Sequence, residues 1–123
     1  MTMAKHNITG KDGEAIARKY LDEHGYLILD TNWHLGHLEA DIIAFKDERI
    51  VFIEVKTRSS EDFGEPEDFV DWKKRRAYVR LANAYVMQKD LHNEARFDII
   101  SIIMDKPSPH VNHIVDAFFT TDC

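Results

Sequence analysis

The stretch RIVFIEVKTR, residues 49–58, places an acid and a base two positions apart at the end of an apolar run. Its β-branched and aromatic residues are typical of a buried strand. Residues two apart in a strand share a face, so Glu54 and Lys56 project to the same side. Either this face is solvated or the two charges take part in chemistry.

A second β-rich run, Leu38 to Phe45, precedes this stretch across the polar residues KDER. The two runs predict an antiparallel hairpin. If the hairpin turns between residues 47 and 48 with an even loop, opposed residues have numbers that sum to 95. An odd loop would shift the register and reverse the faces. The apolar pattern favours the even loop because Ile43 then faces Phe52.

In the even register, Asp41 faces Glu54 and Glu39 faces Lys56, with Cβ atoms about 5 Å apart. Two carboxylates at this separation raise each other's pKa unless a cation lies between them. Mg²⁺ or Mn²⁺ would suit Asp41 and Glu54, since hard cations take carboxylate, water and phosphate oxygens. Lys56 would stabilise the charge that develops on a phosphorane. The pattern predicts metal-assisted phosphodiester hydrolysis.

A simpler interpretation stays open at this point. Glu39 and Lys56 would form a cross-strand ion pair on a solvated sheet face without any chemistry. The opposite face of the stretch carries Val51, Ile53 and Val55, so both faces would be covered and little room would remain for solvated charge. Buried charges are retained when they are paired or coordinated.

The remaining elements complete an α/β pattern. Helical periodicity starts at Asp12, a candidate N-cap, and the whole chain, residues 1–123, is expected to form a single domain. The predicted order is αβββαββ, a mixed β-sheet flanked by a helix on each side. Besides the hairpin, the elements are a helix from Asp12 to about Glu23, a strand from Tyr26 to Trp33, a helix from about Val70 to Lys89, and strands Arg96 to Met104 and Val111 to Phe119.

Basic residues cluster at the start of the second helix, where KKRR is followed by Arg80. Lys73, Arg76 and Arg80 fall on one side of the helix, whereas Lys74 heads an inward row with Tyr78. Cations in the first turn oppose the helix macrodipole, and bound phosphate would relieve this. Alternatively, acids in the preceding loop neutralise the cluster, especially Asp71, by capping the helix or by pairing with Arg75.

Composition limits the function classes. The chain has 16 basic and 22 acidic residues, a net charge of −6, which disfavours a general nucleic-acid binder outside the local basic cluster. A single cysteine, Cys123, excludes an internal disulfide and indicates a reducing compartment. Neither a signal peptide nor a membrane span is recognisable, so a cytoplasmic protein without membrane attachment or nucleotide cofactor is expected.

Other candidate residues have structural interpretations. Arg96 and Asp98 lie two apart in a strand and are expected to pair. The tryptophans are expected to pack, although Trp72, beside the basic cluster, could also stack on a base. Two His-x-x-His pairs lie in strands or loops, where spacing of three means opposite faces, so zinc is not expected.

Several spaced motifs together resemble the YraN-like family, small bacterial proteins with a restriction-endonuclease-like fold. The resemblance covers residues 10–103 and rests on GEAIARKYLDEHGYLILDTNW, LEADIIA, VFIEVKTR, FGEP, VDWKKRR and RFDIISI. The family is similar to archaeal Holliday-junction resolvases and belongs to the PD-(D/E)XK nuclease superfamily. The resemblance therefore implies DNA as partner, with structured DNA as the expected form. Dimerisation fits a junction-cleaving enzyme, but the sequence does not determine it.

The resemblance also implies roles for individual residues. Asp41 and Glu54 match the metal ligands, Lys56 the catalytic lysine, and Glu14 an additional acid of the site. Glu39 matches an acid in the family's Gly-Glu-Ile-Asp motif, which here reads Leu-Glu-Ala-Asp. Two further matches are supporting residues or DNA-backbone contacts: Arg58 after the strand and Lys74 in the helix, the latter grouped with Lys73, Arg76 and Arg80.

The leading hypothesis is a metal-dependent nuclease acting on branched or structured DNA. One alternative is a DNA-binding module that keeps the fold without catalysis, supported by the acidic pI and small size. The other is an adaptor whose acidic surface binds a protein partner.

Overall fold

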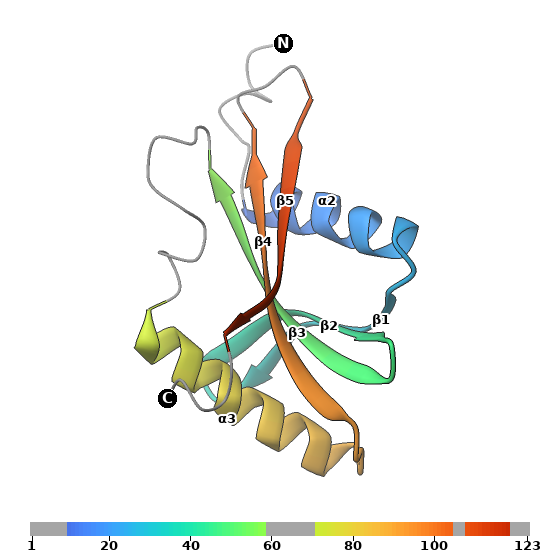
Figure 1. Cartoon of the computed structure of the whole chain (residues 1–123). Coiled ribbons are helices and arrows are strands. Elements are labelled where there is room, and N and C mark those ends of the chain that lie inside the picture. Colours follow the sequence, from blue (N-terminus) through green and yellow to red (C-terminus); the bar gives the residue numbers. More distant parts are fainter. Residues whose placement is uncertain (1–9, 59–70, 105–107, 119–123) are drawn as a thin grey trace.

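The computed structural model describes residues 10–58, 71–104 and 108–118 (Figure 1). These residues form two helices and five strands in the order αβββαββ, as predicted from the sequence. The elements are α2 (Gly10–Glu23), β1 (Leu27–Leu35), β2 (Leu38–Lys46), β3 (Arg49–Arg58), α3 (Trp72–Gln88), β4 (Glu94–Ile103) and β5 (His110–Phe118).

All five strands belong to one twisted sheet, in the order β1-β2-β3-β4-β5. Only β3 and β4 pair in parallel, because α3 forms the crossover between them. The sheet is therefore mixed, as expected. In the β2–β3 hairpin Ile43 pairs with Phe52, which confirms the predicted register. Asp47 and Glu48 both have positive φ, as the two central residues of a tight hairpin turn require.

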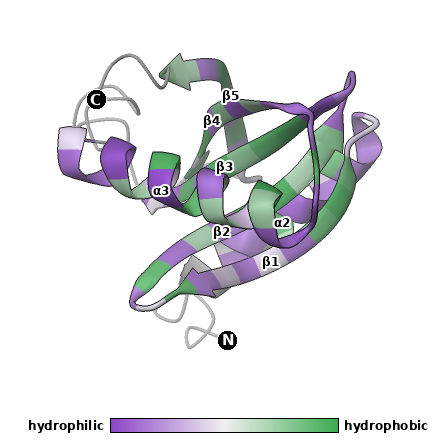
Figure 2. Cartoon of the chain, turned by 90° about the horizontal axis from the view of Figure 1, so that it is seen from below, coloured by the Kyte–Doolittle hydropathy of each residue, from purple (hydrophilic) through white to green (hydrophobic). Residues whose placement is uncertain are grey.

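The two helices cover opposite faces of the sheet, which confirms the predicted layers. Tyr78, Leu81 and Tyr85 of α3 pack on one face with Phe52, and Leu21 of α2 packs on the other. Both faces of β3 are therefore buried from Ile50 to Glu54. Hydrophilic residues predominate on the outer side of α3, while the strands beneath it are largely hydrophobic (Figure 2).

Some predicted boundaries differ from the structure. The first helix begins at Gly10, so Asp12 lies within its first turn and is not the N-cap. The first strand begins at Leu27 and extends past Trp33 to Leu35. Val70 and Phe119, predicted as ends of elements, lie outside the described residues. The prediction of a single domain over residues 1–123 stays a prediction.

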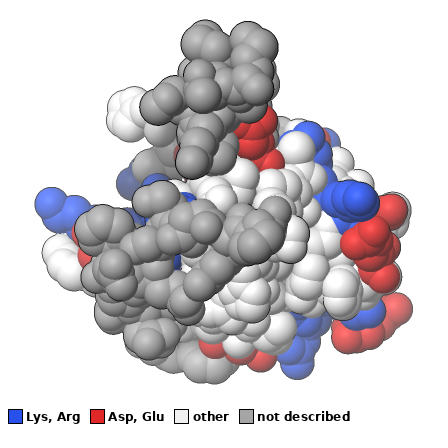
Figure 3. Space-filling model, turned by 90° about the horizontal axis from the view of Figure 1, so that it is seen from above, with Lys and Arg blue, Asp and Glu red and all other residues white. Residues whose placement is uncertain are grey.

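The length of the helices and the surface charge bear on which partners the chain can bind. Among the described helices, none is long and apolar enough to cross a membrane. Acidic and basic side chains of the described residues are interspersed on the face seen from above in Figure 3. The net charge of −6 therefore does not form a uniformly negative surface on that face.

Candidate active site

The site begins where β2 and β3 stop pairing. Their paired residues run from the turn to Ile42 and Ile53, one residue short of Asp41 and Glu54. Beyond this point the Asp41 carboxylate takes over the role of a strand carbonyl and accepts a hydrogen bond from the Val55 backbone N–H at 2.8 Å. The strands thus open at the place where their two acids lie.

Glu54 is the buried acid of the site, with only 5% of its side chain exposed. Its Oε1 accepts a hydrogen bond from the Tyr78 hydroxyl at 2.7 Å. Its Oε2 lies 3.6 Å from Lys56 Nζ and 3.3 Å from Lys74 Nζ. The Lys74 contact confirms that this lysine faces inward, and it links α3 to β3.

The negative charge of Asp41 has fewer stabilising partners than that of Glu54. Burial, and next the negative charge of Glu54, raise the pKa of Asp41 from 3.8 to about 8, although the hydrogen bond from Val55 opposes this. Glu14 adds a smaller repulsion in the same direction. Within the described part of the chain, no Lys, Arg or His lies within ion-pair distance of Asp41. Asp41 therefore lies where negative charge is unfavourable, whereas Glu54 beside it has two lysines within ion-pair distance.

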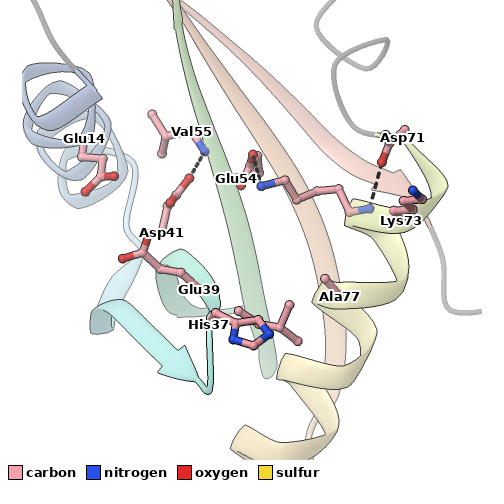
Figure 4. A pocket seen from close by; sticks show the side chains of 11 residues that line it. Glu14, His37, Glu39, Asp41, Glu54, Val55, Asp71, Lys73 and Ala77 are labelled. Carbon is pink, nitrogen blue, oxygen red and sulfur yellow. Dashed lines mark hydrogen bonds and ion pairs between the residues drawn. The ribbon is translucent and has the colours of Figure 1, made fainter.

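Glu14 reaches the site from α2. The helix lies close to β3 at Gly13, where a Cβ would overlap the Thr57 hydroxyl, so glycine allows the close approach. The Glu14 carboxylate accepts a hydrogen bond from Asn32 Nδ2 at 3.0 Å. Asn32 has a φ of 50°, a left-handed conformation that Asn tolerates better than most residues. These contacts orient Glu14 toward Asp41 (Figure 4).

These side chains surround a pocket of about 580 Å³ between α2, the open ends of β2 and β3, and α3 (Figure 4). Both acids and bases line it, which is typical of a site for a charged ligand. We call it the acidic pocket, and its lining residues are Glu14, His37, Leu38, Glu39, Asp41, Glu54, Val55, Asp71, Lys73, Lys74 and Ala77.

The oxygen donors of Asp41 and Glu54 match the ligand preference of Mg²⁺ or Mn²⁺. Among the residues that the structure describes, no three His, Cys, Asp or Glu side chains are grouped so that they could hold a metal ion. If Asp41 and Glu54 held a cation, water or phosphate oxygens would complete its shell. Mg²⁺ sites are commonly of this kind.

The structure brings together most of the predicted site residues. Glu14, Glu39, Asp41, Glu54, Lys73 and Lys74 line the acidic pocket, and Lys56 adjoins it through Glu54. Arg76 and Arg80 line a neighbouring hollow along α3. Arg58, the end of β3, lines none of the hollows found in the described part of the chain.

The expected pairing of Glu39 with Lys56 is wrong. Glu39 instead lies 3.2 Å from His34, its register partner on β1. Since β2 and β3 separate beyond Ile42, Glu39 no longer faces β3, and Lys56 turns to Glu54. The role of Asp71 as helix cap is confirmed, because its side chain accepts the Lys74 backbone N–H at 2.9 Å.

Sequence reasoning missed two residues of the site. Helical spacing predicts Tyr78 only as part of the buried row of α3, yet its hydroxyl donates to Glu54 and accepts the Asp41 backbone N–H at 3.3 Å. A tyrosine rather than a phenylalanine in a core row was the available signal, since buried hydroxyls need partners. For Asn32, the contact with Glu14 joins residues 18 positions apart, and no local pattern indicates it.

Arg96 and Asp98 form the predicted pair, at 2.8 Å, within a larger network. Asp98 also lies 2.7 Å from His113 Nε2, whose Nδ1 is 3.1 Å from the Tyr20 hydroxyl. Arg96 donates to the Tyr26 hydroxyl as well. This network ties α2 to the far strands of the sheet.

The order of elements and the acid–lysine pocket define an α/β protein with the layout expected of a restriction-endonuclease-like core. A model of uncharacterised protein family UPF0102 matches residues 13–102. The chain belongs to this family, which confirms the resemblance to YraN-like proteins.

Full-length relatives agree with this assignment. UPF0102 proteins from Parabacteroides distasonis and Bacteroides thetaiotaomicron are each 46% identical over 117 residues, covering 95% of this chain and 97% of the relative. A UPF0102 protein from Flavobacterium psychrophilum is also 46% identical, over 95% of this chain and 98% of its own length.

Proposed function

We propose that this chain is a metal-dependent nuclease that hydrolyses phosphodiester bonds in DNA, with branched or otherwise structured DNA as substrate. The observation that carries the proposal is the environment of the Asp41 carboxyl group, which lies beside Glu54 in a partly buried position. Its pKa is raised to about 8 by burial and by Glu54, while the ammonium groups of Lys56 and Lys74 lie within ion-pair distance of Glu54 and, among the described residues, not of Asp41. A divalent cation would remove this repulsion.

The donor set fits Mg²⁺ or Mn²⁺, which Asp41 and Glu54 would hold. When bound, the ion would lower the pKa of a coordinated water and neutralise charge on the scissile phosphate. Glu14 and Glu39 line the same pocket and would accept hydrogen bonds from its waters. Tyr78, through its hydrogen bond to Glu54, would keep that carboxylate in place.

Lys56 would act on the phosphate and the attacking water. Its ammonium group lies on the face of Glu54 and 36% of its side chain is exposed, so it is accessible to substrate. A compact positive charge there stabilises the negative charge that the phosphorane acquires. Lys74 reaches the same carboxylate from α3 and would hold a second phosphate oxygen.

The test is cleavage of labelled four-way junction, flap and linear DNA by the purified chain, with Mg²⁺ or Mn²⁺ titrated from zero. We expect cleavage that requires the metal. Lys56→Ala should lower the rate about 10²- to 10³-fold, the usual effect of removing one transition-state contact. Lys19→Ala, an exposed lysine on α2, is the matched control and should cleave like wild type.

Two results would contradict the proposal. One is folded wild-type protein that cleaves none of these DNAs with either metal. The other is Lys56→Ala protein that cleaves as fast as wild type, which would assign the activity to a contaminant or another site.

A non-catalytic DNA-binding module is the second candidate. The two lysines already pair with Glu54, and this arrangement neutralises that acid without any metal. Such a module would bind DNA with affinity that falls steeply with salt, but it would leave the DNA intact. The third possibility, a protein adaptor, predicts no salt-sensitive DNA binding at all.

A further inference from the structure

The acidic pocket continues into a groove along α3. A hollow of about 360 Å³ shares Leu38, Lys73 and Ala77 with the acidic pocket. A further hollow of about 310 Å³ shares Trp72, Arg76 and Arg80 with the previous one and extends to Val79. We call these two hollows the α3 groove; its residues are Leu38, Trp72, Lys73, Arg76, Ala77, Val79 and Arg80.

The groove is positively charged in a chain whose net charge is −6. Lys73, Arg76 and Arg80 line it, and all three are exposed. No described carboxylate lies within ion-pair distance of these three side chains. Asp71 caps the start of α3 by accepting the Lys74 backbone N–H, and the first turn that follows holds no acid. A polyanion complements this surface.

An exposed aromatic ring lies in the same groove. Trp72 is 56% exposed, so of the two roles that the sequence left open for it, packing and stacking on a base, packing is not observed. Its ring centroid is 5.4 Å from the Arg76 guanidinium. The other tryptophan, Trp33, meets the Tyr85 ring edge to face and packs against the core. An exposed ring beside cations is the surface on which proteins stack unpaired bases.

Duplex DNA does not offer the faces of its bases, because they are stacked within the helix. A single strand offers both phosphates and base faces, and the α3 groove has a feature for each. Trp72, Arg76 and Arg80 are spaced four residues apart and therefore share one side of the helix. Apolar Leu38, Ala77 and Val79 complete the walls without competing for phosphate.

We propose that the α3 groove binds a single-stranded segment of nucleic acid, with a base stacked on Trp72 and phosphates on Lys73, Arg76 and Arg80. The strand leads into the acidic pocket, so the substrate is DNA with an unpaired segment beside the scissile bond, such as a flap, gap or open branch point. Cleavage of the bound strand rests on the proposed nuclease function, but binding of the strand can be measured without cleavage.

The binding test uses Trp33→Phe protein, in which Trp72 is the remaining tryptophan of the two in the chain. Metal-free protein in EDTA is titrated with an oligodeoxythymidine of about 12 nucleotides, within the usual site size of single-strand binders. Stacking should quench the Trp72 fluorescence in a saturable way. An unchanged spectrum at saturation, with binding measured by anisotropy, would overturn the proposal.

The affinity test compares variants that retain Trp33, so it does not depend on the folding of the Trp33→Phe protein. Trp72→Ala should weaken oligodeoxythymidine binding about tenfold, while Trp72→Phe keeps most of the affinity. Binding of a blunt duplex of equal length should change little. Equal losses on both DNAs, or none on the single strand, would contradict the proposal.

Salt dependence tests the cations. Arg76→Ala and Arg80→Ala should each reduce the slope of log affinity against log salt by about 0.7, the value for one phosphate contact on a single strand. Lys19→Ala on α2 should leave the slope unchanged. Displacement of the oligonucleotide by polyglutamate at equal charge concentration would instead indicate an acidic protein partner and overturn the assignment.

The two proposals fail separately. Quenching of Trp72 without cleavage of any DNA would keep the groove and reject the nuclease. Metal-dependent cleavage in which Trp72→Ala cuts flapped and blunt duplex DNA as wild type does would keep the nuclease and reject the groove.

Discussion

Asp98 and Asp41 are acids of the same sheet in opposite electrostatic situations. Asp98 is fully buried and accepts hydrogen bonds from Arg96 Nε and Nη2 and from the Asp116 backbone N–H, with His113 Nε2 at 2.7 Å. Burial alone raises the pKa of Asp98, but the hydrogen bonds from His113 and Arg96 outweigh it and hold the pKa below its ordinary value.

Within the described ranges, the Asp41 carboxylate accepts one hydrogen bond, from the Val55 N–H, and another carboxylate lies beside it. Its pKa moves in the opposite direction, to about 8. A buried carboxylate whose oxygens are all hydrogen-bonded or ion-paired stabilises the fold. A buried carboxylate with few such partners can still bind a ligand. The contrast separates a structural cluster from a candidate active site without reference to any relative.

The largest expected effect is at the structural cluster. Asp98→Asn removes the negative charge and leaves the Arg96 guanidinium, 6% exposed, without its counterion. The free energy of unfolding should fall by about 3–5 kcal/mol, the usual result of breaking a buried ion pair. Urea unfolding at neutral pH measures this.

The pH dependence of the free energy of unfolding tests whether the charge of Asp98 causes this effect. Because the folded pKa of Asp98 is lowered, its stabilisation is present above the unfolded value near 3.8 and is lost as the pH falls through the folded pKa. The difference between wild type and Asp98→Asn should therefore shrink in acid. Asp90→Asn, at a 93% exposed side chain, is the control and should change stability little. If Asp98→Asn and Asp90→Asn changed the free energy of unfolding equally, Asp98 would not have a structural role.

Asp41→Asn should change the stability in the opposite direction and stabilise the fold. Because the folded pKa of Asp41 is raised, its contribution favours the folded state below pH 3.8 and is lost as the pH rises to about 8. Asn avoids that loss and keeps an oxygen for the Val55 N–H. In EDTA, the variant should match wild type near pH 4 and melt on the order of 5 °C higher at pH 8 and above.

The same variant should lose metal-dependent cleavage. Glu39→Gln serves as control for stability, since Glu39 pairs with His34 outside the Asp41–Glu54 pair. A Tm difference between wild type and Asp41→Asn that stays constant from pH 4 to 9 would show that Asp41 is not under electrostatic strain.

A smaller effect is expected from Tyr78→Phe, which removes the hydroxyl bound to Glu54. Loss of this buried hydrogen bond should lower the free energy of unfolding by about 1–2 kcal/mol. Because Tyr78 positions Glu54, the Mg²⁺ concentration for half-maximal cleavage should rise about tenfold, the low end of the range for lost support of a metal ligand.

Tyr85→Phe is the matched control on the same helix. Tyr85 donates a hydrogen bond of the same length, 2.7 Å, to Asp30, away from the acidic pocket. It should reduce stability by a similar amount and leave the Mg²⁺ requirement unchanged. A parallel shift in the Mg²⁺ requirement for both variants would mean that Tyr78 acts through stability alone.

The hairpin that forms the site was predictable because its determinants are local. Alternation of apolar residues in β2 and β3 and a two-residue turn specify the register within about twenty positions of sequence. The acids Asp41 and Glu54 follow from that register. The inward direction of Lys74 follows in the same way, from helical spacing with Tyr78.

Contacts between distant elements were not predictable from spacing. Glu14 was assigned by resemblance alone, and its support by Asn32 depends on how α2 lies across the sheet. The Tyr20–His113–Asp98 chain joins residues 93 positions apart at its first contact. Sequence periodicity shows which face of an element is apolar, but not which polar group of another element meets it.

Short-range periodicity is enough to predict the order of elements, the hairpin register and the placement of two acids and a lysine near one another. It does not predict that β2 and β3 separate at Asp41, that both lysines and Tyr78 contact Glu54, or that Trp72 stays exposed beside the cations. These features arise when α2 and α3 pack against the sheet, because that packing brings together charged groups and rings that lie far apart in the chain.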